Sequence, residues 1–331
     1  MIVAGQANRP RHSAMPRSSA RVRAQAEPPG PVKLWRGEPI RLSSSQVTAH
    51  DESAGAMPRH VGSIGAPRKA SSNPDPAPSM PTDDSALPPC RSCRPGEPLP
   101  FDFTMAFQPI VDVARREVFA YEALVRGTAG EGAETILGQI NHDNRYVFDQ
   151  SCRVKAVELA ARLGVPCFVS INFLPNAVYQ AATCIRATLQ AAQRFGFPTR
   201  QLIFEITENE QLVEKEHLKS IIREYKRQGF RTAIDDFGAG YSGLNLLAEF
   251  QPDIIKLDMA MVRAVDTDPV RQAIVAGILG VCRALGIEAI AEGVESEAEY
   301  RLLHGMGIRL FQGFLFARPA FEALPPVHWP D

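Results

Sequence analysis

Eight short apolar runs, most of them separated by longer amphipathic stretches, constrain the fold of this chain more than any other feature. They cover residues 105–113, 118–125, 167–173, 202–207, 231–236, 253–258, 288–294 and 309–313. The runs are rich in β-branched and aromatic residues, and this composition predicts β-strands. Strands that alternate with helices along a chain indicate an α/β fold with a mainly parallel sheet.

The intervening stretches have the spacing of helices. Apolar residues recur three and four positions apart in 148–163, in 210–228 and in 270–285, and the last stretch has its stripe at Ile274, Ile278, Val281 and Leu285. A glycine follows most of the helical stretches just before the next strand, where a helix commonly ends in a residue with positive φ. These glycines are Gly164, Gly196, Gly229, Gly286 and Gly307.

Eight strands with alternating helices in about 230 residues predict a (β/α)8 TIM-like barrel, with an open doubly wound sheet as the alternative. Only residues 113–117 separate the first two runs, which is too short for a helix. Because so short a connection joins antiparallel strands, these two should form a hairpin. We therefore expect a TIM-like barrel whose first strand is antiparallel.

The N-terminal part of the chain differs in composition from the rest. The first 100 residues hold 17 of the 27 prolines and a single aromatic residue, Trp35. Such a segment cannot bury enough apolar surface to offset the entropy of ordering its backbone. We predict a disordered tail over 1–98 and one folded domain over 99–331. The change in composition also suggests the hypothesis that the natural start is Met80, or that residues 1–79 are dispensable.

Charge divides in the same place. Residues 1–79 carry a net charge of +6 and the remaining residues −7. A basic tail can contact nucleic acid or anionic lipid, and a solvated low-complexity tail is the simpler interpretation. An acidic domain binds polyanions poorly, so we expect no nucleic-acid polymer as its ligand, and a phosphate ligand should need metal ions to dock.

The sequence contains no signal for a membrane or for export. No run approaches the roughly 20 apolar residues of a membrane span, and the N-terminus lacks the hydrophobic core of a secretory signal. Cysteines within apolar runs, such as Cys152 and Cys184, suit reduced thiols in a cytoplasm. Cys90 and Cys93 form a lone CxxC, compatible with half a zinc site, a redox pair or incidental thiols.

Polar residues stand near the carboxyl ends of nearly all the predicted strands. In a barrel of this kind those ends meet at one mouth, where catalysis takes place. The residues are Glu122, Asn172, Glu205, Asp235, Asp236, Lys256, Glu292 and Gln312. Any one of them alone is more often a helix cap or a surface ion pair. Their recurrence in phase with the strands predicts a single site.

The residue types at this mouth point to a hard divalent cation. Converging carboxylates repel one another in a low-dielectric cleft unless cations lie among them. Ligation by oxygen alone favours Mg²⁺ or Mn²⁺ over zinc, and no histidine of the folded part falls at these positions. Asp235 and Asp236 can both face one site only where the strand turns, because consecutive strand residues point opposite ways. One carboxylate bridging two cations is the usual core of a phosphoester site.

Over residues 105–320 the sequence resembles the EAL family of cyclic di-GMP phosphodiesterases. The family triplet is Glu122, Ala123 and Leu124, with Arg126 after it. The other motifs follow in order: QPI (108–110), IN (171–172), FEITEN (204–209), DDFGAGYS (235–242), IKLD (255–258), AEGVE (291–295) and QGF (312–314). The resemblance implies hydrolysis of cyclic di-GMP to linear pGpG with two Mg²⁺ or Mn²⁺ ions per site, and inhibition by Ca²⁺. It also implies a cytoplasmic protein that forms a homodimer and receives its input from a sensor or regulatory partner.

The resemblance assigns a role to each residue of the site. Glu122, Asn172, Glu205 and Asp235 match the ligands of one cation, and Asp235, Asp236 and Glu292 those around the second cation and its water. Lys256 matches the lysine that positions or deprotonates the attacking water, and Glu292 acts with it. Gln108, Arg126 and Gln312 match residues near the substrate, and Glu208 matches the residue that holds the DDFGAG loop.

Two alternatives stay open. The first is a silent receptor that binds cyclic di-GMP and signals through a protein partner. Silent members usually lose a metal ligand or the lysine, and all of these are present here. The second is an unrelated metal-dependent barrel enzyme that acts on a small phosphorylated or enolisable substrate.

Overall fold

The structure is a computed structural model that describes residues 98–178, 180–207, 215–240 and 243–330. The predicted tail up to residue 97, with Met80, Cys90 and Cys93, lies outside the described residues. Glu208 lies outside them as well. None of the helices in the described part is both long enough and apolar enough to cross a membrane.

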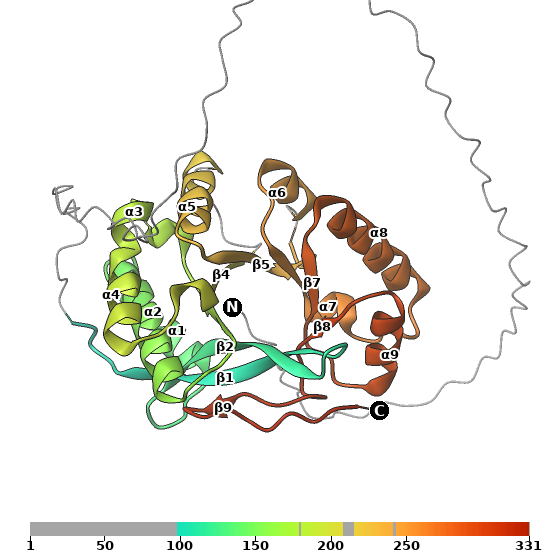
Figure 1. Ribbon diagram of the computed structural model, residues 1–331, viewed down its shortest axis with the longest axis horizontal. Coiled ribbons are helices and arrows are strands. Elements are labelled where there is room, and N and C mark those ends of the chain that lie inside the picture. Colours follow the sequence, from blue (N-terminus) through green and yellow to red (C-terminus); the bar gives the residue numbers. More distant parts are fainter. Residues whose placement is uncertain (1–97, 179, 208–214, 241–242, 331) are drawn as a thin grey trace, which may run out of the picture. The chain divides into compact units, whose positions relative to one another are not determined.

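Eight strands close into a barrel (Figure 1). They are β1 (Phe103–Asp112), β2 (Glu117–Gly127), β3 (Phe168–Asn172), β4 (Leu202–Thr207), β5 (Arg231–Phe237), β6 (Ile254–Leu257), β7 (Glu288–Ala291) and β8 (Leu310–Phe311). Strands β2 to β8 pair in chain order and in parallel, and β1 closes the ring by pairing antiparallel with both β8 and β2. The predicted TIM-like barrel with an antiparallel first strand is confirmed, and the open sheet is excluded.

Helices lie outside the barrel, with α2 and α4 on one side and α8 and α9 on the other (Figure 1). The helices are α1 (Ala133–Leu137), α2 (Arg145–Arg162), α3 (Ala181–Cys184), α4 (Arg186–Phe195), α5 (Lys215–Arg227), α6 (Gly243–Glu249), α7 (Met259–Val262), α8 (Pro269–Leu285) and α9 (Glu297–Gly305). The five glycines predicted to end helical stretches all have positive φ, between 65° and 98°. That prediction is confirmed.

The core-facing stripe predicted for residues 270–285 is wrong in part. Helix α8 forms there, but Ile274 is 48% exposed and Leu285 is 45% exposed. The buried side is centred on Val275, Ile278 and Leu279 instead. The error has a physical reason: α8 is apolar on nearly all sides, so its periodicity does not define which face meets the barrel.

A layer of apolar side chains fills the barrel near the amino ends of its parallel strands. It consists of Ile110, Ala120, Ile203, Ala233, Ile254, Ile290 and Leu310, one from each of seven strands. Residues two apart on a strand point to the same side. The next inward positions toward the mouth are therefore Gln108, Glu122, Glu205, Asp235, Lys256, Glu292 and Gln312. A dry floor thus lies directly beneath the polar residues.

Candidate active site

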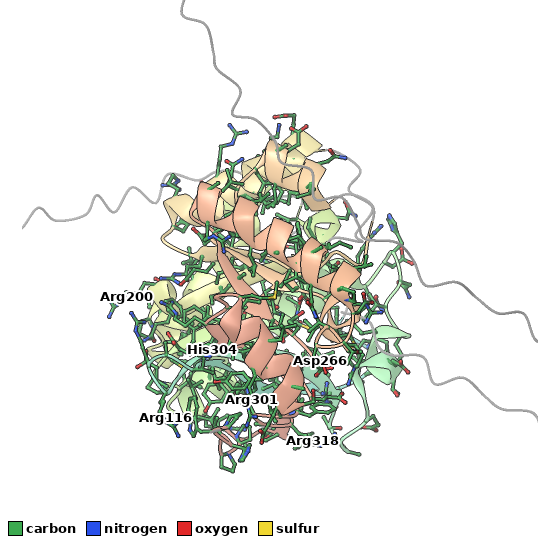
Figure 2. The ribbon with its side chains drawn as sticks, turned by 90° about the vertical axis from the view of Figure 1, so that its right-hand side faces the viewer. Arg116, Arg200, Asp266, Arg301, His304 and Arg318 are labelled. Atoms are coloured by element: carbon green, nitrogen blue, oxygen red, sulfur yellow. The ribbon has the colours of Figure 1, made fainter. Side chains whose placement is uncertain are left out.

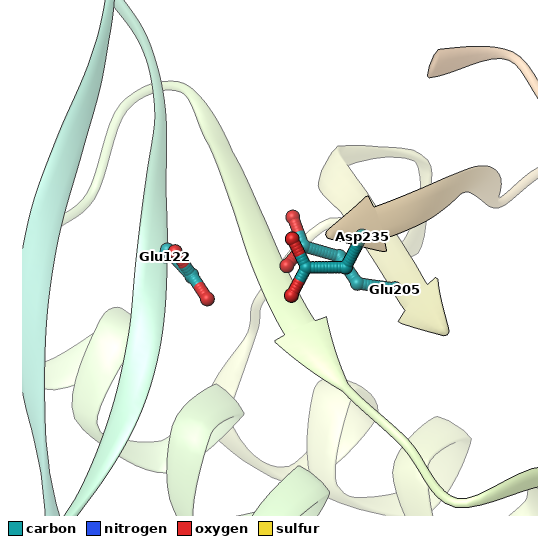
Figure 3. A group of neighbouring side chains, drawn as sticks. All are labelled: Glu122, Glu205 and Asp235. Carbon is teal, nitrogen blue, oxygen red and sulfur yellow. The ribbon is translucent and has the colours of Figure 1, made fainter. Parts of the chain in front are cut away.

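The mouth of the barrel brings two overlapping groups of carboxylates together. The oxygens of Glu122, Glu205 and Asp235 lie within 4.8 Å of one another, and so do those of Asp235, Asp236 and Glu292. Figure 3 shows Glu122 on β2 facing Glu205 of β4 and Asp235 of β5 across the mouth. Asp235 belongs to both groups, which is the arrangement that lets one carboxylate serve two neighbouring cations.

Asp235 and Asp236 reach the same cluster because β5 has a bulge at this point. The pairing with β6 shifts between Ile234 and Phe237, and Asp236 has a φ of 53°, in the left-handed region. An extra residue in one strand re-aims the side chains next to it. The strand was expected to turn at the two adjacent aspartates; instead β5 continues to Phe237, and the bulge brings both side chains to the site.

Lys256 lies at the centre of the carboxylates. Its Nζ is 2.7 Å from Glu292 Oε1, 2.9 Å from both Glu205 Oε2 and Asp235 Oδ1, and 3.4 Å from Glu122 Oε2. Burial disfavours the ammonium, but the four carboxylates, Asp235 first, outweigh it and hold the pKa of Lys256 well above its usual range. The lysine is therefore a buried cation bound on several sides by acidic groups.

A single ammonium does not balance the surrounding acids. Burial raises the pKa of Glu205 to about 8, with Lys256 opposing the shift and Glu122 and Asp235 adding to it. Burial likewise raises the pKa of Glu292 well above its usual range, against the opposing charge of Lys256. Burial and the neighbouring Asp235 also raise the pKa of Asp236. The cluster consequently contains more carboxylates than one ammonium can neutralise, and additional positive charge would stabilise their ionised forms.

Carboxamides complete the ring of donors. Asn172 Nδ2 donates to Glu122 Oε1 at 2.9 Å, and Gln312 Nε2 donates to Glu122 Oε2 at 2.8 Å. Gln108 accepts from Gln312 at 3.3 Å and donates to the carbonyl of Ala317 at 3.1 Å. The Oδ1 atom of Asn172 is buried and has no hydrogen-bond partner within the described part of the chain.

Ser170 belongs to this site but was not predicted from the sequence. It lies two residues before Asn172 on β3, is fully buried, and donates a short hydrogen bond to Glu205 Oε1. A hydroxyl in an otherwise apolar strand, on the same side as a predicted ligand, was the available signal. Ser170 fixes the orientation of the Glu205 carboxylate.

Arg126 lies farther out on β2 than Glu122, at the edge of the mouth. Its Nη1 donates to the carbonyl of Val125 at 2.7 Å. Burial lowers the pKa of Arg126, and the charge of Glu122 opposes that shift. Arg126 also lines an open hollow of about 440 Å³ together with Thr128 and Phe321.

An apolar cavity of about 410 Å³ adjoins the carboxylates. Its walls include Leu124, Leu137 and Phe148, and it reaches the site at Glu122 and Asn172. Low-dielectric surroundings of this kind strengthen every charge interaction at the mouth.

The side chains at the mouth fit divalent cations. The donors are carboxylate and carboxamide oxygens, which suit Mg²⁺, Mn²⁺ and Ca²⁺. A bound cation would give the Oδ1 atom of Asn172 a partner. It would also neutralise part of the negative charge of the grouped carboxylates. Glu122, Asn172, Glu205 and Asp235 could hold one ion, and Asp235, Asp236 and Glu292 a second.

Comparison with known proteins identifies the family of the chain. The model of the EAL domain family matches residues 101–319. The chain is 33% identical over 227 residues to the blue light- and temperature-regulated antirepressor BluF of Escherichia coli, covering 68% of this chain and 56% of that protein. It is 41% identical over 144 residues to the cyclic di-GMP phosphodiesterase PdeR of Escherichia coli, covering 42% of this chain and 22% of PdeR. The chain thus spans about half or less of the length of these two relatives.

A solved structure is also closely similar. The cyclic di-GMP-bound form of a standalone EAL protein from Vibrio cholerae is 54% identical, with a TM-score of 0.68, over 70% of this chain and 98% of that one. The family match extends over most of the described residues and includes every strand of the barrel. The chain belongs to the EAL domain family, whose members include cyclic di-GMP phosphodiesterases.

Proposed function

We propose that this chain hydrolyses one phosphodiester of cyclic di-GMP to give linear pGpG, with the help of two divalent cations, Mg²⁺ or Mn²⁺. The observation that carries the proposal is the pair of carboxylate groups that share Asp235, with Lys256 between them. Similarity to PdeR, a named phosphodiesterase, and to a cyclic di-GMP-bound EAL structure supports the substrate.

The reaction needs water to attack phosphorus while the 3′ oxygen leaves. Bound divalent cations would polarise the phosphoryl oxygens and make the water more acidic. Glu292 at 2.7 Å and Asp235 at 2.9 Å hold Lys256 Nζ in a fixed position, where it would lie beside the attacking water. Cations held by the same carboxylates would oppose the rise in the pKa of Lys256 and favour its neutral amine, which can accept a proton from that water.

The substrate contacts are proposed from the outer part of the mouth. Arg126, four residues after Glu122 on β2, would bind a phosphate through its guanidinium. Gln312 and Gln108 are buried and hydrogen-bonded to each other, so that Gln312 would meet the substrate or its water with Gln108 behind it. Glu208, outside the described residues, is proposed to hold the DDFGAG loop.

Turnover with either Mg²⁺ or Mn²⁺ tests the hydrolysis. We expect the wild-type chain to form pGpG, Glu122→Ala to lose metal-dependent turnover, and Lys256→Ala to lose turnover while cyclic di-GMP binding is largely kept. Binding of cyclic di-GMP by the wild type without any pGpG would refute the enzyme. That result would favour a receptor, the alternative suggested by the similarity to the antirepressor BluF. Near-normal rates in Lys256→Ala would refute only the role of the lysine in activating water and would leave the proposed hydrolysis standing.

We also propose that two copies of the chain pair through exposed apolar side chains of α6, α7 and α8. These side chains are Leu244 on α6, Met259 on α7, and Val270 and Ile274 on α8, which are 42% to 66% exposed. Figure 2 looks onto the side of the molecule where α8 and α9 lie, with Arg301 and His304 of α9 labelled. Sedimentation should give a dimer for the wild type and a monomer for Ile274→Lys, whereas Phe321→Lys, on β9 (Ala320–Phe321), should stay dimeric. A monomeric wild type would exclude the pairing.

The domain boundaries are part of the proposal. We propose that residues 99–331 form the catalytic domain, that 1–98 is a tail, and that the protein acts in the cytoplasm under control of a regulatory partner. Expression of residues 80–331 should give a folded, active protein. An insoluble or inactive product would exclude Met80 as a sufficient start.

A further inference from the structure

A buried ion pair lies on the inner face of α2, behind the proposed cation ligands Asn172 and Glu205. Arg153 Nη2 is 2.6 Å from Asp149 Oδ2, one helical turn earlier, and the two side chains are 0% and 1% exposed. A buried ion pair of this kind stabilises a fold no better than a well-packed apolar pair does. Two charges at this depth therefore call for a role besides stability.

Asp149 contacts the backbone just beyond a predicted ligand. Its Oδ1 accepts a hydrogen bond from the backbone N–H of Leu174 at 2.8 Å, two residues after Asn172. Asp149 and Asn172 also line the same apolar cavity. The carboxylate thus fixes the chain where it leaves β3, and with it the direction in which Asn172 projects.

Arg153 contacts the flanks of two ligands at once. Its guanidinium carbon lies 5.2 Å from the ring centre of Phe173, which follows Asn172, and 5.5 Å from that of Phe204, which precedes Glu205. The two strands are also joined at this level, since the N–H of Phe173 donates to the carbonyl of Glu205 at 3.0 Å. A guanidinium stacked on two rings holds them at a fixed separation.

Tyr225 of α5 closes the network from the other side. Arg153 Nη1 donates to its hydroxyl at 2.6 Å, and its ring packs on Phe173 and Phe204 with centres 5.3 Å and 4.8 Å apart. Three segments, α2, the β3–β4 pair and α5, therefore meet at one guanidinium.

We propose that Asp149 and Arg153 are positioning residues, which hold Asn172 and Glu205 in the geometry of cation ligands and thereby set the affinity of that cation. The inference rests on the proposed function, because it takes these two residues as ligands. Groups that orient a ligand commonly change metal affinity by about 10- to 100-fold when they are removed. If the pair were purely structural, its removal would change the stability of the protein and leave the metal affinity of the folded protein unaltered.

Charge-balanced double variants of the full chain test the proposal without leaving one charge buried alone. Asp149→Leu with Arg153→Met removes both the ion pair and the acceptor for Leu174. Asp149→Asn with Arg153→Met removes the ion pair but keeps an acceptor for that N–H, and it serves if the first variant does not fold. Val275→Ala, a fully buried change on α8 outside this network, controls for general loss of stability.

Mn²⁺ binding by calorimetry, the Mn²⁺ dependence of turnover and the melting temperature are measured on each protein. We expect Mn²⁺ affinity to fall about tenfold or more in the Leu/Met variant and less in the Asn/Met variant. Turnover at saturating Mn²⁺ should recover toward that of the wild type. Val275→Ala should melt earlier with unchanged affinity.

Unchanged Mn²⁺ affinity in a folded double variant would overturn the positioning role, whatever the melting temperature. Mn²⁺ binding by the wild type without pGpG formation would instead refute the proposed hydrolysis, and the comparison of affinities would still decide the role of Asp149 and Arg153.

Discussion

Glu205 is 1% exposed and has a pKa of about 8, against an ordinary value of 4.5, so that its ionisation is linked to the stability of the whole barrel. A carboxyl with a higher pKa in the folded than in the unfolded chain binds protons preferentially in the folded state. Its contribution favours folding at low pH and is lost as the pH rises from about 4.5 to about 8. At about 1.4 kcal/mol per pKa unit, the loss is at most about 5 kcal/mol.

The Glu205→Gln variant removes this dependence with little change in shape. Glutamine keeps one oxygen, which can accept from Lys256, and its amide NH2 can donate to the hydroxyl oxygen of Ser170, where Glu205 accepts from both groups. At pH 8.5 in EDTA we expect the variant to exceed the wild type in unfolding free energy by about 2 to 4 kcal/mol. At pH 5 the two should be nearly equal, because the wild-type carboxyl is then protonated in the folded state.

Urea unfolding at pH 5 and 8.5, with EDTA or with Mn²⁺, measures the effect. Saturating Mn²⁺ should stabilise the wild type at pH 8.5 by mass action and should stabilise the variant much less, since the variant lacks a ligand. A variant less stable than the wild type at pH 8.5 in EDTA would refute the electrostatic reasoning. A wild-type stability that is the same at both pH values in EDTA would refute it equally.

Three further predictions concern other parts of the structure. Glu299 accepts from the backbone N–H groups of Ala264, Glu295 and Ser296, and these bonds outweigh burial and lower its pKa. The stabilisation by the ionised Glu299 is therefore present at neutral pH and lost as the pH falls below about 4.5. Glu299→Gln should unfold at a lower urea concentration than the wild type at pH 7, and the difference should shrink as the pH is lowered. A Cβ on Gly313 would lie 2.0 Å from the carbonyl oxygen of Val294, so Gly313→Ala should lower the melting temperature sharply and, by moving the neighbouring Gln312, reduce turnover. Gly280→Ala in α8, where a Cβ meets nothing within 4 Å, is the matched control; it should leave turnover unchanged and raise the melting temperature slightly, because alanine favours a helix. Calcium accepts longer bonds and looser geometry than Mg²⁺, so replacement of Mg²⁺ by Ca²⁺ should keep cyclic di-GMP binding in a titration and abolish pGpG formation.

The barrel could be predicted because its apolar floor and its polar site both follow the two-residue alternation of inward side chains along the strands. The inward positions at Ile203 and Ile254 are apolar, and two residues later stand Glu205 and Lys256. This regular offset is readable in the sequence and needs no knowledge of long-range contacts. It explains why all eight barrel strands were found at nearly their observed positions.

Other features depend on contacts that the period does not encode. Strand β9 has only two residues, and its existence rests on pairing with Ala106 and Phe107, more than 200 positions earlier. The bulge at Asp236 is visible as two adjacent aspartates, but its left-handed backbone is not. Arg153 and Asp149 occupy buried positions of α2, where an amphipathic pattern leads one to expect apolar residues. Partners far away in the sequence account for them there: the backbone N–H of Leu174 for Asp149, and the Tyr225 hydroxyl with the rings of Phe173 and Phe204 for Arg153.

The burial of this site explains both the strength of its charge interactions and the electrostatic cost of holding its carboxylates together. The apolar floor lies beneath four carboxylates that are largely buried and that a single ammonium cannot balance. The folded chain consequently holds acidic groups at an electrostatic cost, which protons reduce at low pH and divalent cations would reduce at high pH. The side chains behind the ligands must then resist the mutual repulsion of the carboxylates as well as orient them. Ser170, bound to Glu205, and the Asp149–Arg153 pair, braced between Phe173 and Phe204, lie where that resistance is needed.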